Sequence, residues 1–498
     1  MARRSAALIV ALVSCAALPT AACADEIQAN PSTFAGVFNS ARPGDTIVLA
    51  AGSYGRFRGG MKGGMVTIKA APGAAVTMSL ALAPAQNLTF DGLTLEDVEL
   101  GHSQTRNITV RNSTIPGQTT LRTGELANAN ILFDRNVHPA WDKCDGCGEG
   151  RVFLPEKRAE PSGITIRNSR FGPGGDSDGI QNGSNGTHIL NNEFVGIRQL
   201  ANGQAHADSI QLYGSRNTVI RGNWFHDVSV GVMAPDGADH ELIEDNVIQA
   251  RSPYAINLKS DEGSIVRHNT LPDGACEYNQ RCGYILLGAK SGNPASSGTV
   301  IRDNILANVS WGGQTADEDY NLMAVGRGRG AHDTRGLPRY AGGQAPASYA
   351  GFQLAAGSNG KGTASDGFDR GARIGVVVGP PGSAGKGKLR PYVRLLSGKR
   401  GVRRHGRLRL RIRMLSAGTV ALNPKALPNR RPNARPVRMR MLTLKFVRAG
   451  SRTISLRLSG DARRRLLRWG KPKLVIRTFA DGRRRSPSGT FVLAVRRR

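Results

Sequence analysis

Aromatic residues are scarce in this chain, and long apolar runs are almost absent. Only 5% of the 498 residues are aromatic, whereas 39% are hydrophobic and 63 are glycine. This composition supports an apolar core but excludes one built from layers of bulky aromatic side chains. The single continuously apolar stretch lies near the N-terminus and is too short to span a bilayer, so an integral membrane bundle is excluded.

Acidic residues are nearly missing from the C-terminal quarter of the chain. Residues 384–498 contain 35 Lys and Arg but only two acids, Asp461 and Asp481, which gives a net charge of +33. The rest of the chain carries 33 basic and 35 acidic residues and is close to neutral. We expect the cationic part to bind polyanions: acidic polysaccharide, anionic cell-wall polymers and, without sequence specificity, nucleic acid.

The first 24 residues have the pattern of an export signal. Arg3 and Arg4 form a basic start, Ala6–Val13 is apolar, and Ala22-Cys23-Ala24 is a small-residue cleavage pattern. The pattern predicts a signal peptide over residues 1–24 and a secreted, extracellular protein. The segment Leu12-Val13-Ser14-Cys15 also resembles a lipobox, so a cell-surface lipoprotein is the alternative.

Cysteine is rare as well, and removal of the signal leaves Cys144, Cys147, Cys276 and Cys282. An oxidising compartment favours disulfides, and the members of each pair are close in sequence, so we expect bridges Cys144–Cys147 and Cys276–Cys282. The Cys-x-x-Cys spacing also fits a redox motif or half of a zinc site. The redox interpretation lacks a surrounding βαβ pattern, and a four-cysteine zinc site would have to join two distant loops.

A six-residue repeat is the strongest signal in the sequence. It is apolar at its first and sixth positions, small or polar at its third, and usually Asn or Ser at its fourth. The copies start 20 to 35 residues apart, with a base period of about 23 and insertions of 8 to 12. They are Phe90–Leu95, Val110–Ile115, Phe133–His138, Ile166–Phe171, Ile189–Phe194, Ile220–Phe225, Ile243–Ile248, Val266–Leu271 and Ile301–Leu306.

A period near 23 without helical periodicity predicts a parallel β-solenoid. Leucine-rich repeats have a similar period but require a Leu-x-x-Leu-x-Leu frame, which is absent. Stacked apolar positions would form a continuous core. Asn at the fourth position predicts an amide ladder along the stack and would tolerate the left-handed backbone that such corners need.

These repeats resemble the right-handed parallel β-helix of the pectate-lyase superfamily. The segments Pro43–Leu49, Gly52–Tyr54 and Val66–Ala70 are similar to the first coils of secreted β-helix polysaccharide lyases, and Ser32–Ala41 would cap the open end. The resemblance implies an all-β, right-handed parallel β-helix over residues 25–374 and a carbohydrate-active protein. It does not fix the chemistry, because this fold hosts lyases, hydrolases, epimerases and inert adhesins.

A second domain follows the solenoid. Residues 375–388 are rich in Gly and Pro and predict a linker. Beyond them apolar residues alternate with Arg over Arg407–Met414, which is the period of a half-buried strand. We expect an Ig-like antiparallel β-sandwich over residues 389–498 with one arginine-coated face and a short helix at Asp461–Trp469. Gln353–Gly357 and Asp366–Gly371 are expected to be the last strand and the exit segment of the solenoid.

The strands that precede the repeats align on one buried apolar position: Ile180, Ile210, Val232, Ile256 and Leu286. The next residue of each strand then faces outward: Gln181, Gln211, Met233, Asn257 and Leu287. Asp178 and Asp208 stand two residues before the buried position, so Asp-Gly-Ile-Gln and Asp-Ser-Ile-Gln are one motif on adjacent coils. The insertions Gly172–Asp176 and Arg198–Ala207 would form the walls of a groove beside it.

Two carboxylates on adjacent coils would lie about 4.8 Å apart and would need a shared proton or a cation. Asp178 and Asp208 are therefore a candidate Ca²⁺ site and, with His206 and Lys259 as acid and base, a candidate catalytic set for β-elimination of a uronate. The candidate substrate-binding residues are Gln181, Gln211, Tyr213 and Asn257. The structural alternative is that the Asp residues only form Asx-turns and that the amides form a ladder.

A competing resemblance is to polygalacturonase-type hydrolases. The segment Asp176–Ile180 resembles their Asn-Thr-Asp-Gly-Ile, Asp208 falls where one member of an Asp pair would be, and Ile256–Lys259 resembles their Arg-Ile-Lys. Their Gly-His-Gly is missing, and Ser209 stands in place of the second Asp. An inverting hydrolase also needs about 6.5–9.5 Å between its carboxylates.

The sequence thus predicts a secreted, monomeric protein that acts on an acidic polysaccharide as a lyase. A polygalacturonase-like hydrolase and a non-catalytic adhesion protein are the alternatives. The loops at 139–162, 196–207 and 272–283 are expected to leave the solenoid. The arginines at the second repeat position form either a solvated stripe or a track for an acidic polymer: Arg111, Arg167, Arg221, Arg267 and Arg302.

Overall fold

The structure is a computed structural model, in which the chain divides into two compact units, Met1–Gly375 and Val376–Arg498. It describes residues 24–157, 163–201, 203, 206–273, 276–277, 281–312, 314, 316–375, 392–395, 402–403, 406–414, 418–427, 437–439, 442–446, 450–468, 473–480 and 489–494. The predicted signal peptide and the predicted linker lie almost wholly outside these residues.

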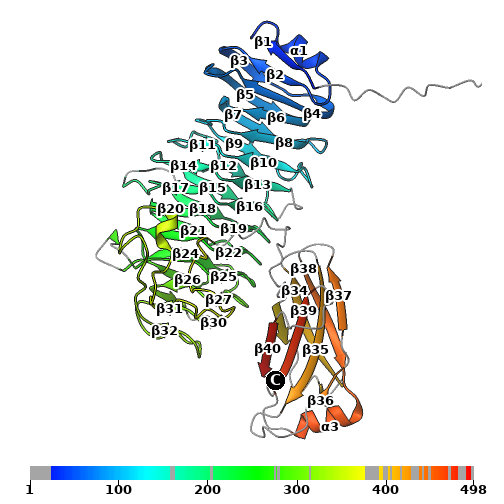
Figure 1. Ribbon diagram of the computed structural model, residues 1–498, viewed down its shortest axis with the longest axis vertical. Helices are drawn as coiled ribbons and strands as arrows, with labels where there is room; N and C mark the ends of the chain where they lie inside the picture. Colours follow the sequence, from blue (N-terminus) through cyan, green and yellow to red (C-terminus); the bar gives the residue numbers. More distant parts are fainter. Residues whose placement is uncertain are drawn as a thin grey trace, which may run out of the picture. The chain divides into compact units, whose positions relative to one another are not determined.

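The first unit is a right-handed parallel β-helix, as predicted. Its strands stack in chain order along the coil axis (Figure 1). The largest sheet consists of β1 (Glu26–Ala29), β2 (Thr46–Leu49), β4 (Met61–Ala70), β6 (Gln86–Asp91), β8 (Arg106–Arg111), β10 (Ile131–Asp134), β13 (Ile164–Arg167), β16 (His188–Leu190), β19 (Val219–Arg221), β22 (Leu242–Glu244), β25 (Ile265–Arg267), β27 (Val300–Arg302) and β30 (Asp317–Asp319).

Three further sheets form the other faces of the solenoid. We call the longest of them the site sheet: β3 (Gly52–Phe57), β5 (Val76–Leu82), β7 (Thr94–Leu100), β9 (Thr119–Leu121), β12 (Gly150–Leu154), β15 (Asp178–Asn182), β18 (Asp208–Leu212), β21 (Val230–Ala234), β24 (Tyr254–Lys259), β26 (Tyr284–Gly288) and β29 (Asn308–Ser310). The two shorter sheets consist of β11 (Val137–His138), β14 (Arg170–Phe171), β17 (Glu193–Val195), β20 (Trp224–Val228) and β23 (Val247–Ala250), and of β28 (Ile305–Leu306), β31 (Leu322–Met323) and β32 (Thr334–Arg335).

The six-residue repeat sets the register of the stack. Its first position pairs with itself from coil to coil, as in Ile189 with Ile220 and Ile220 with Ile243. These residues are fully buried, and so are most of the apolar residues at the sixth position. The period and the continuous apolar core are therefore confirmed.

The predicted amide ladder runs along the fourth position. Nδ2 of Asn246 donates to Oδ1 of Asn269 at 2.9 Å, and Nδ2 of Asn269 donates to Oδ1 of Asn304 at 3.0 Å. The left-handed backbone, however, falls on the third position, so that part of the prediction is wrong. The fourth side chain must point into the corner to join the ladder, and the chain makes its sharp bend one residue earlier. The residues with positive φ are Gly92, Asn112, Arg135, Asn168, Asn191, Gly222, Asp245, His268 and Asp303.

The arginines of the second position are paired with acids of neighbouring coils. Arg111 Nη2 lies 2.8 Å from Asp91 Oδ2, and Arg167 Nε lies 3.1 Å from Asp134 Oδ1. Asp91 and Asp134 occupy the same repeat position as the arginines, so acidic side chains interrupt the stripe. This arrangement favours the solvated-stripe interpretation over a cationic track.

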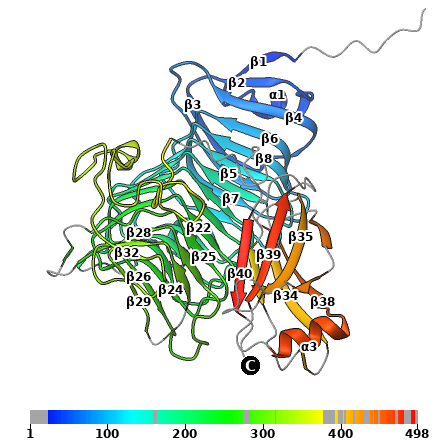
Figure 2. The ribbon, with the colours of Figure 1, turned by 60° about the horizontal axis from the view of Figure 1, so that its bottom comes forward.

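Helix α1 (Phe34–Ser40) closes the N-terminal end of the core, as predicted (Figure 2). Phe34 and Phe38 are buried and pack on Phe57, with ring centroids 5.1 and 4.9 Å apart. The cap therefore covers apolar side chains that the first coil would otherwise leave in water.

Three details of the predicted coil path are wrong. Gly150–Leu154 is a regular strand of the site sheet rather than part of an insertion. A register shift between Tyr254 and Ile256 moves β26 by one residue, so Ile285 and Leu287 are buried and Leu286 faces outward. Gln353–Gly357 is not a last strand, because only Leu354 forms a bridge, to Tyr340.

The segment that follows the last coil turns back along the solenoid. It contains the short 3-10 helix η2 (Tyr349–Phe352) and contacts three successive coils. Gly371 N–H donates to Asp303 O at 2.8 Å, Ala372 N–H donates to Thr270 Oγ1 at 3.0 Å, and Arg373 Nε donates to Asp245 Oδ1 at 2.7 Å. We call residues 365–374 the clasp.

The second unit is a small antiparallel β-sandwich, as predicted. One sheet consists of β33 (Tyr392–Leu395), β34 (Arg407–Met414) and β38 (Gly450–Arg457). The other consists of β35 (Gly418–Leu427), β36 (Val437–Arg438), β37 (Leu442–Phe446), β39 (Lys473–Ala480) and β40 (Gly489–Ala494), and helix α3 spans Gly460–Arg468. On β34, Leu408 and Leu410 are buried while Arg407 and Arg409 are exposed, which gives the predicted arginine-coated face.

Candidate functional site

Asp178 and Asp208 begin neighbouring strands of the site sheet, β15 and β18. The Asp208 N–H donates to Asp178 Oδ1 at 2.8 Å, and the Asp178 N–H donates to Glu149 O at 2.8 Å. The backbone of three successive coils therefore brings Glu149, Asp178 and Asp208 into one column. The two aspartates are adjacent, as their shared motif requires.

The pair lies inside the protein rather than in an open groove. Asp178 is fully buried and Asp208 is 7% exposed. Arg151, itself 1% exposed, donates to Ser177 O at 2.9 Å and to Pro139 O at 2.9 Å, so it ties the loop after β11 against the entrance of β15. The expectation that Asp178 and Asp208 line an open groove is therefore wrong, although the two insertions predicted as its walls do border a cavity of about 370 Å³.

Burial decides the protonation of the pair. Loss of solvent raises the pKa of Asp178 well above its ordinary value, and the neighbouring Asp208 charge raises it further. Burial raises the pKa of Asp208 to about 6, with His206 opposing and Glu149 adding to the shift. Asp178 Oδ2 has no hydrogen-bond partner among the described residues. At least one of the two carboxyls thus holds a proton near neutral pH.

The pair does not fit a Ca²⁺ ion. Calcium takes six to eight oxygen ligands, whereas this pocket offers two carboxyls that burial drives toward the neutral form. Within the described part of the chain, no group of three or more His, Cys, Asp or Glu residues could hold a metal ion. We therefore derive no step through calcium.

Three ionisable side chains near the pair are at least partly exposed to solvent. We call Lys143, Glu149 and His206 the surface triad. Lys143 Nζ lies 3.6 Å from Glu149 Oε1, and His206 Nδ1 lies 3.6 Å from Glu149 Oε2. The His206 side chain is 66% exposed, whereas Lys143 and Glu149 are about a third exposed or less. Lys143 also lines a cavity of about 280 Å³ with Cys144, Asp145, Gly146, Cys147 and Asp176.

Glu149 and Lys143 were missed by sequence reasoning because residues 139–162 were interpreted as one insertion. The available signal was the strand Gly150–Leu154, whose alternating Val152 and Leu154 are both buried. Gly150 pairs with Asp178 in the sheet, so Glu149 precedes the position that the two aspartates occupy on the next coils.

The outward amides form part of a ladder beneath the triad. Gln181 Nε2 donates to Gln211 Oε1 at 2.7 Å, and Gln181 Oε1 accepts from the Glu149 N–H at 3.0 Å. The ladder stops at Met233, whose sulfur accepts from Asn257 Nδ2 at 3.2 Å, and Asn257 Oδ1 has no partner among the described residues. Gln181 and Gln211 thus hold Glu149 in place.

Two of the expected site residues lie elsewhere. The Tyr213 hydroxyl donates to Leu154 O at 2.9 Å, and burial raises its pKa, so it serves the structure of the coil. Lys259 ends β24, which lies two strands from β18. It stands three residues beyond Ile256, which is in register through Val232 with Ile210 of β18, and Ile210 is two residues beyond Asp208. At about 3.3 Å per residue and 4.8 Å per strand, this separation is roughly 15–20 Å. The structure does not bring Lys259 to the aspartates.

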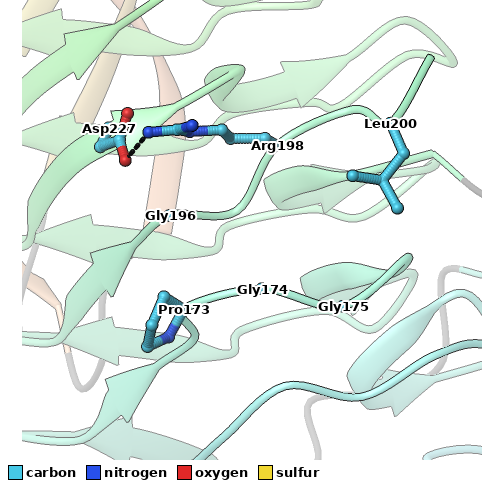
Figure 3. A pocket seen from close by; sticks show the side chains of 7 residues that line it. All are labelled: Pro173, Gly174, Gly175, Gly196, Arg198, Leu200 and Asp227. Carbon is cyan, nitrogen blue, oxygen red and sulfur yellow. Dashed lines mark hydrogen bonds and ion pairs between the residues drawn. The ribbon is translucent and has the colours of Figure 1, made fainter.

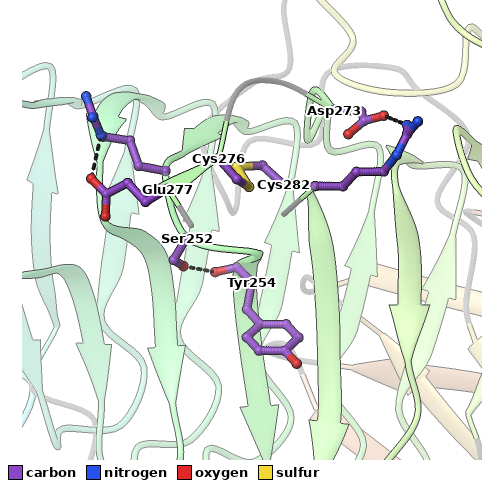
Figure 4. Close-up of a disulfide and its surroundings, with 8 residues drawn as sticks. Ser252, Tyr254, Asp273, Cys276, Glu277 and Cys282 are labelled. Atoms are coloured by element: carbon purple, nitrogen blue, oxygen red, sulfur yellow. Dashed lines mark hydrogen bonds and ion pairs between the residues drawn. A yellow bond between two sulfur atoms is a disulfide. The ribbon is translucent and has the colours of Figure 1, made fainter. Parts of the chain in front are cut away.

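Both predicted disulfides are present. Cys144–Cys147 borders the cavity beside the triad, and Cys276–Cys282 closes a loop near the start of β24 (Figure 4). Each bridge joins residues of one loop, six positions apart at most, so both stabilise insertions rather than link coils.

Neutralising one member of the buried pair will change how stability depends on pH. The pKa of Asp208 in the folded protein is raised to about 6. Its contribution to the free energy of unfolding is therefore fully present below pH 4 and is lost as the pH rises through 6. Asp208→Asn removes this decline. We expect it to flatten the pH profile of the unfolding midpoint between pH 4 and 7 and to raise stability at pH 8 by about 2 kcal/mol. Urea unfolding at several pH values measures this, with the exposed Asp97→Asn as control; equal profiles for wild type and Asp208→Asn would contradict it.

Comparison with known proteins gives one family match. A family described as periplasmic copper-binding protein (NosD), a family of right-handed β-helix proteins, matches residues 149–324. These residues include Glu149, Asp178, Asp208 and the coils around them. No curated protein matches the chain.

Two solved polysaccharide lyases are similar in fold. The PL6 family alginate lyase AlyGC is 13% identical with a TM-score of 0.42, and the match covers 73% of this chain and 60% of the lyase. Pectate lyase Pel9A is 13% identical with a TM-score of 0.34, and the match covers 70% of this chain and 96% of the lyase. The chain thus spans about 60% of the length of the alginate lyase, and likeness at this level does not bear on the chemistry. Among the described residues, no helix is long and apolar enough to cross a membrane.

Proposed function

We propose that the protein is an exported carbohydrate-active β-helix protein that binds an acidic polysaccharide at the surface triad and cleaves it by β-elimination. The carrying observation is that an ammonium and an exposed imidazole each lie 3.6 Å from the same carboxylate, beside a cavity of about 280 Å³. Elimination at a uronate needs a positive charge for the substrate carboxylate and a group that accepts the proton beside it.

The triad supplies these groups in the following way. Lys143 binds the uronate carboxylate and stabilises the negative charge that develops there. His206 takes the proton from the carbon next to the carboxylate, the bond from the neighbouring carbon to the glycosidic oxygen breaks, and a carbon–carbon double bond forms. Water at this exposed site protonates the departing oxygen, and Glu149 stabilises the imidazolium. Asp178 and Asp208 stay buried and keep the coils beneath Glu149 in register.

Export is supported by the two disulfides, by the N-terminal signal pattern and by the periplasmic location named for the matching family. We do not extend that family's copper binding to this chain, since the described residues contain no cluster that fits a metal. Nor do we favour a hydrolase, because both members of the predicted carboxylate pair are buried.

We further propose that the cationic unit binds anionic polymers. On its three-stranded sheet, Arg407 and Arg457 are direct cross-strand neighbours, and both are exposed. Like charges placed opposite each other destabilise a sheet, so this arrangement does not serve stability. A polyanion that binds there would relieve the repulsion.

Cleavage is tested by incubating the full chain with a panel of polyuronates and following the absorbance of the unsaturated product. We expect product from at least one polymer and a rate loss of about 100-fold or more in His206→Ala. His332→Ala is the matched control, because His332 is also an exposed histidine beside a carboxylate, 2.9 Å from Asp319. Lys259→Met should keep the wild-type rate.

The same assay separates the alternatives. Retention of a polyuronate without any product would support the non-catalytic binding protein, which the burial of Asp178 and Asp208 favours. Saturated oligosaccharides would indicate a hydrolase. Unchanged elimination in His206→Ala would remove the surface triad from consideration.

A further inference from the structure

A second cavity, of about 370 Å³, lies between two loops of successive coils (Figure 3). One wall is Pro173–Gly175, the other runs from Gly196 to Leu200, and Asp227 of the next coil completes it. Hydrogen bonds hold these coils in step: Gly174 N–H donates to Gly196 O at 3.1 Å, and Gly196 N–H donates to His226 O at 3.2 Å. The volume is at the lower end of the range of small-molecule sites, roughly 300–1,000 Å³.

Glycine is required at several positions in the walls of this cavity. Gly174 and Gly175 have φ values of 83° and 88°, which side chains rarely adopt. A Cβ on Gly175 would lie 2.4 Å from Trp141 O, and one on Gly196 would lie 2.7 Å from Pro173 Cβ. A side chain at Gly196 would thus clash with Pro173 on the opposite wall, and one at Gly175 would clash with Trp141 in the loop after β11.

The arginine at this cavity shares its counter-ion with a second arginine. Arg198 is ion-paired with Asp227, and Asp227 Oδ1 also binds Arg251 Nη1 at 3.0 Å. If Arg198 turned to an incoming anion, Asp227 would keep Arg251 as its counter-ion. An arginine offers two parallel N–H donors to a carboxylate, and Leu200, 48% exposed, adds an apolar surface for a sugar ring.

The two cavities share one loop. Gly174 and Gly175 line the larger cavity, and the next residue, Asp176, lines the smaller cavity beside the surface triad. Neighbouring Cα atoms are about 3.8 Å apart, so both cavities border the same short segment. A polymer that crosses this loop would place successive units in the two cavities.

We infer that the cavity lined by Arg198, Leu200 and Asp227 is a second carbohydrate subsite, which binds the carboxylate of the uronate unit adjoining the one at Lys143. This inference rests on the proposed function and deepens it. The ligand is an oligouronate of at least two units, with Arg198 exchanging Asp227 for the substrate carboxylate.

The test measures calorimetric binding of oligouronates of increasing length to the full chain carrying His206→Ala, which prevents turnover. We expect the dissociation constant to fall as the oligomer grows long enough to fill both cavities. Arg198→Met in this background should weaken the longer oligomers by about tenfold and leave the shortest unchanged, because only the longer ones reach Arg198. Leu200→Ala should act in the same direction with a smaller effect.

The matched control is Arg170→Met, which removes another arginine of a surface ion pair. Its side chain is 44% exposed, the same as that of Arg198. Neutral oligosaccharides of equal length should show no dependence on Arg198. Length-dependent uronate binding that Arg198→Met leaves unaltered would overturn the second subsite but keep the proposed function. Absence of uronate binding of any length in the parent protein would overturn both.

Discussion

Glu244→Ala is expected to destabilise the solenoid by about 3–5 kcal/mol, because it leaves three partly buried guanidinium groups without their common anion. Glu244 is 1% exposed. Arg221 Nε lies 2.6 Å from its Oε1, Arg267 Nη2 lies 2.6 Å from its Oε2, and Arg373 Nη2 lies 3.4 Å from its Oε2. Urea unfolding at pH 7 measures the loss.

The difference in stability between Glu244→Ala and the wild type should disappear at low pH. Burial raises the pKa of Glu244, but Arg267, Arg221 and Arg373 outweigh it and hold the pKa at about 2. A depressed pKa contributes stability above the unfolded value of about 4.5 and loses it as the pH falls through 2. The variant and the wild type should therefore converge as the pH approaches 2.

Asp91→Ala is the matched control for Glu244→Ala. Asp91 occupies the same repeat position and pairs with Arg111, but its side chain is 20% exposed and that of Arg111 is 40% exposed. A surface pair of this kind contributes about 1 kcal/mol or less. Equal losses in the two variants would show that burial of the Glu244 cluster does not set its energy.

The affinity of the full chain for an anionic polymer should fall steeply as the salt concentration rises. Six to ten contacts to a polyanion lose about 10³–10⁵ in binding constant between 50 and 200 mM salt. Replacing Arg407, Arg409 and Arg457 together with Gln should reduce the slope of log K against log salt by about 2–3. A charge-matched set on the solenoid, Arg58, Arg106 and Arg335, is the control.

The measurement is retention on immobilised polyuronate at stepped ionic strength. If binding persisted at high salt, or if both triple variants lowered the slope equally, the exposed face of β34 and β38 would not be the docking surface. Nucleic acid should show the same salt dependence without preference among sequences, because arginine recognises the charge alone.

Periodic features of the molecule were predictable, and non-periodic ones were not. Ile189, Ile220 and Ile243 repeat an apolar position that must be buried on every coil, so period, core and ladder follow from sequence. The register of β26 did not, because the shift near Tyr254 leaves no mark in an apolar run such as Tyr284–Leu287.

The candidate site was only partly predictable for the same reason. Adjacency of Asp178 and Asp208 follows from their shared motif on successive coils. Their burial depends on Pro139 and Trp141, whose carbonyls accept from Arg151 and Ser177. Those contacts belong to an insertion that occurs once in the chain, so no repeat pattern predicts them. Glu149 lies in the same insertion and was missed for the same reason.

The clasp alters how this stack can come apart. In a solenoid each coil normally touches only its neighbours, so the terminal coils can fray one at a time. Residues 371–373 bind Asp303, Thr270 and Asp245, which lie on three successive coils. Detaching any one of these coils breaks contacts that the others also share. The C-terminal end of the solenoid therefore behaves as one cooperative block, and amide protons of all three coils should exchange with solvent through the same opening event.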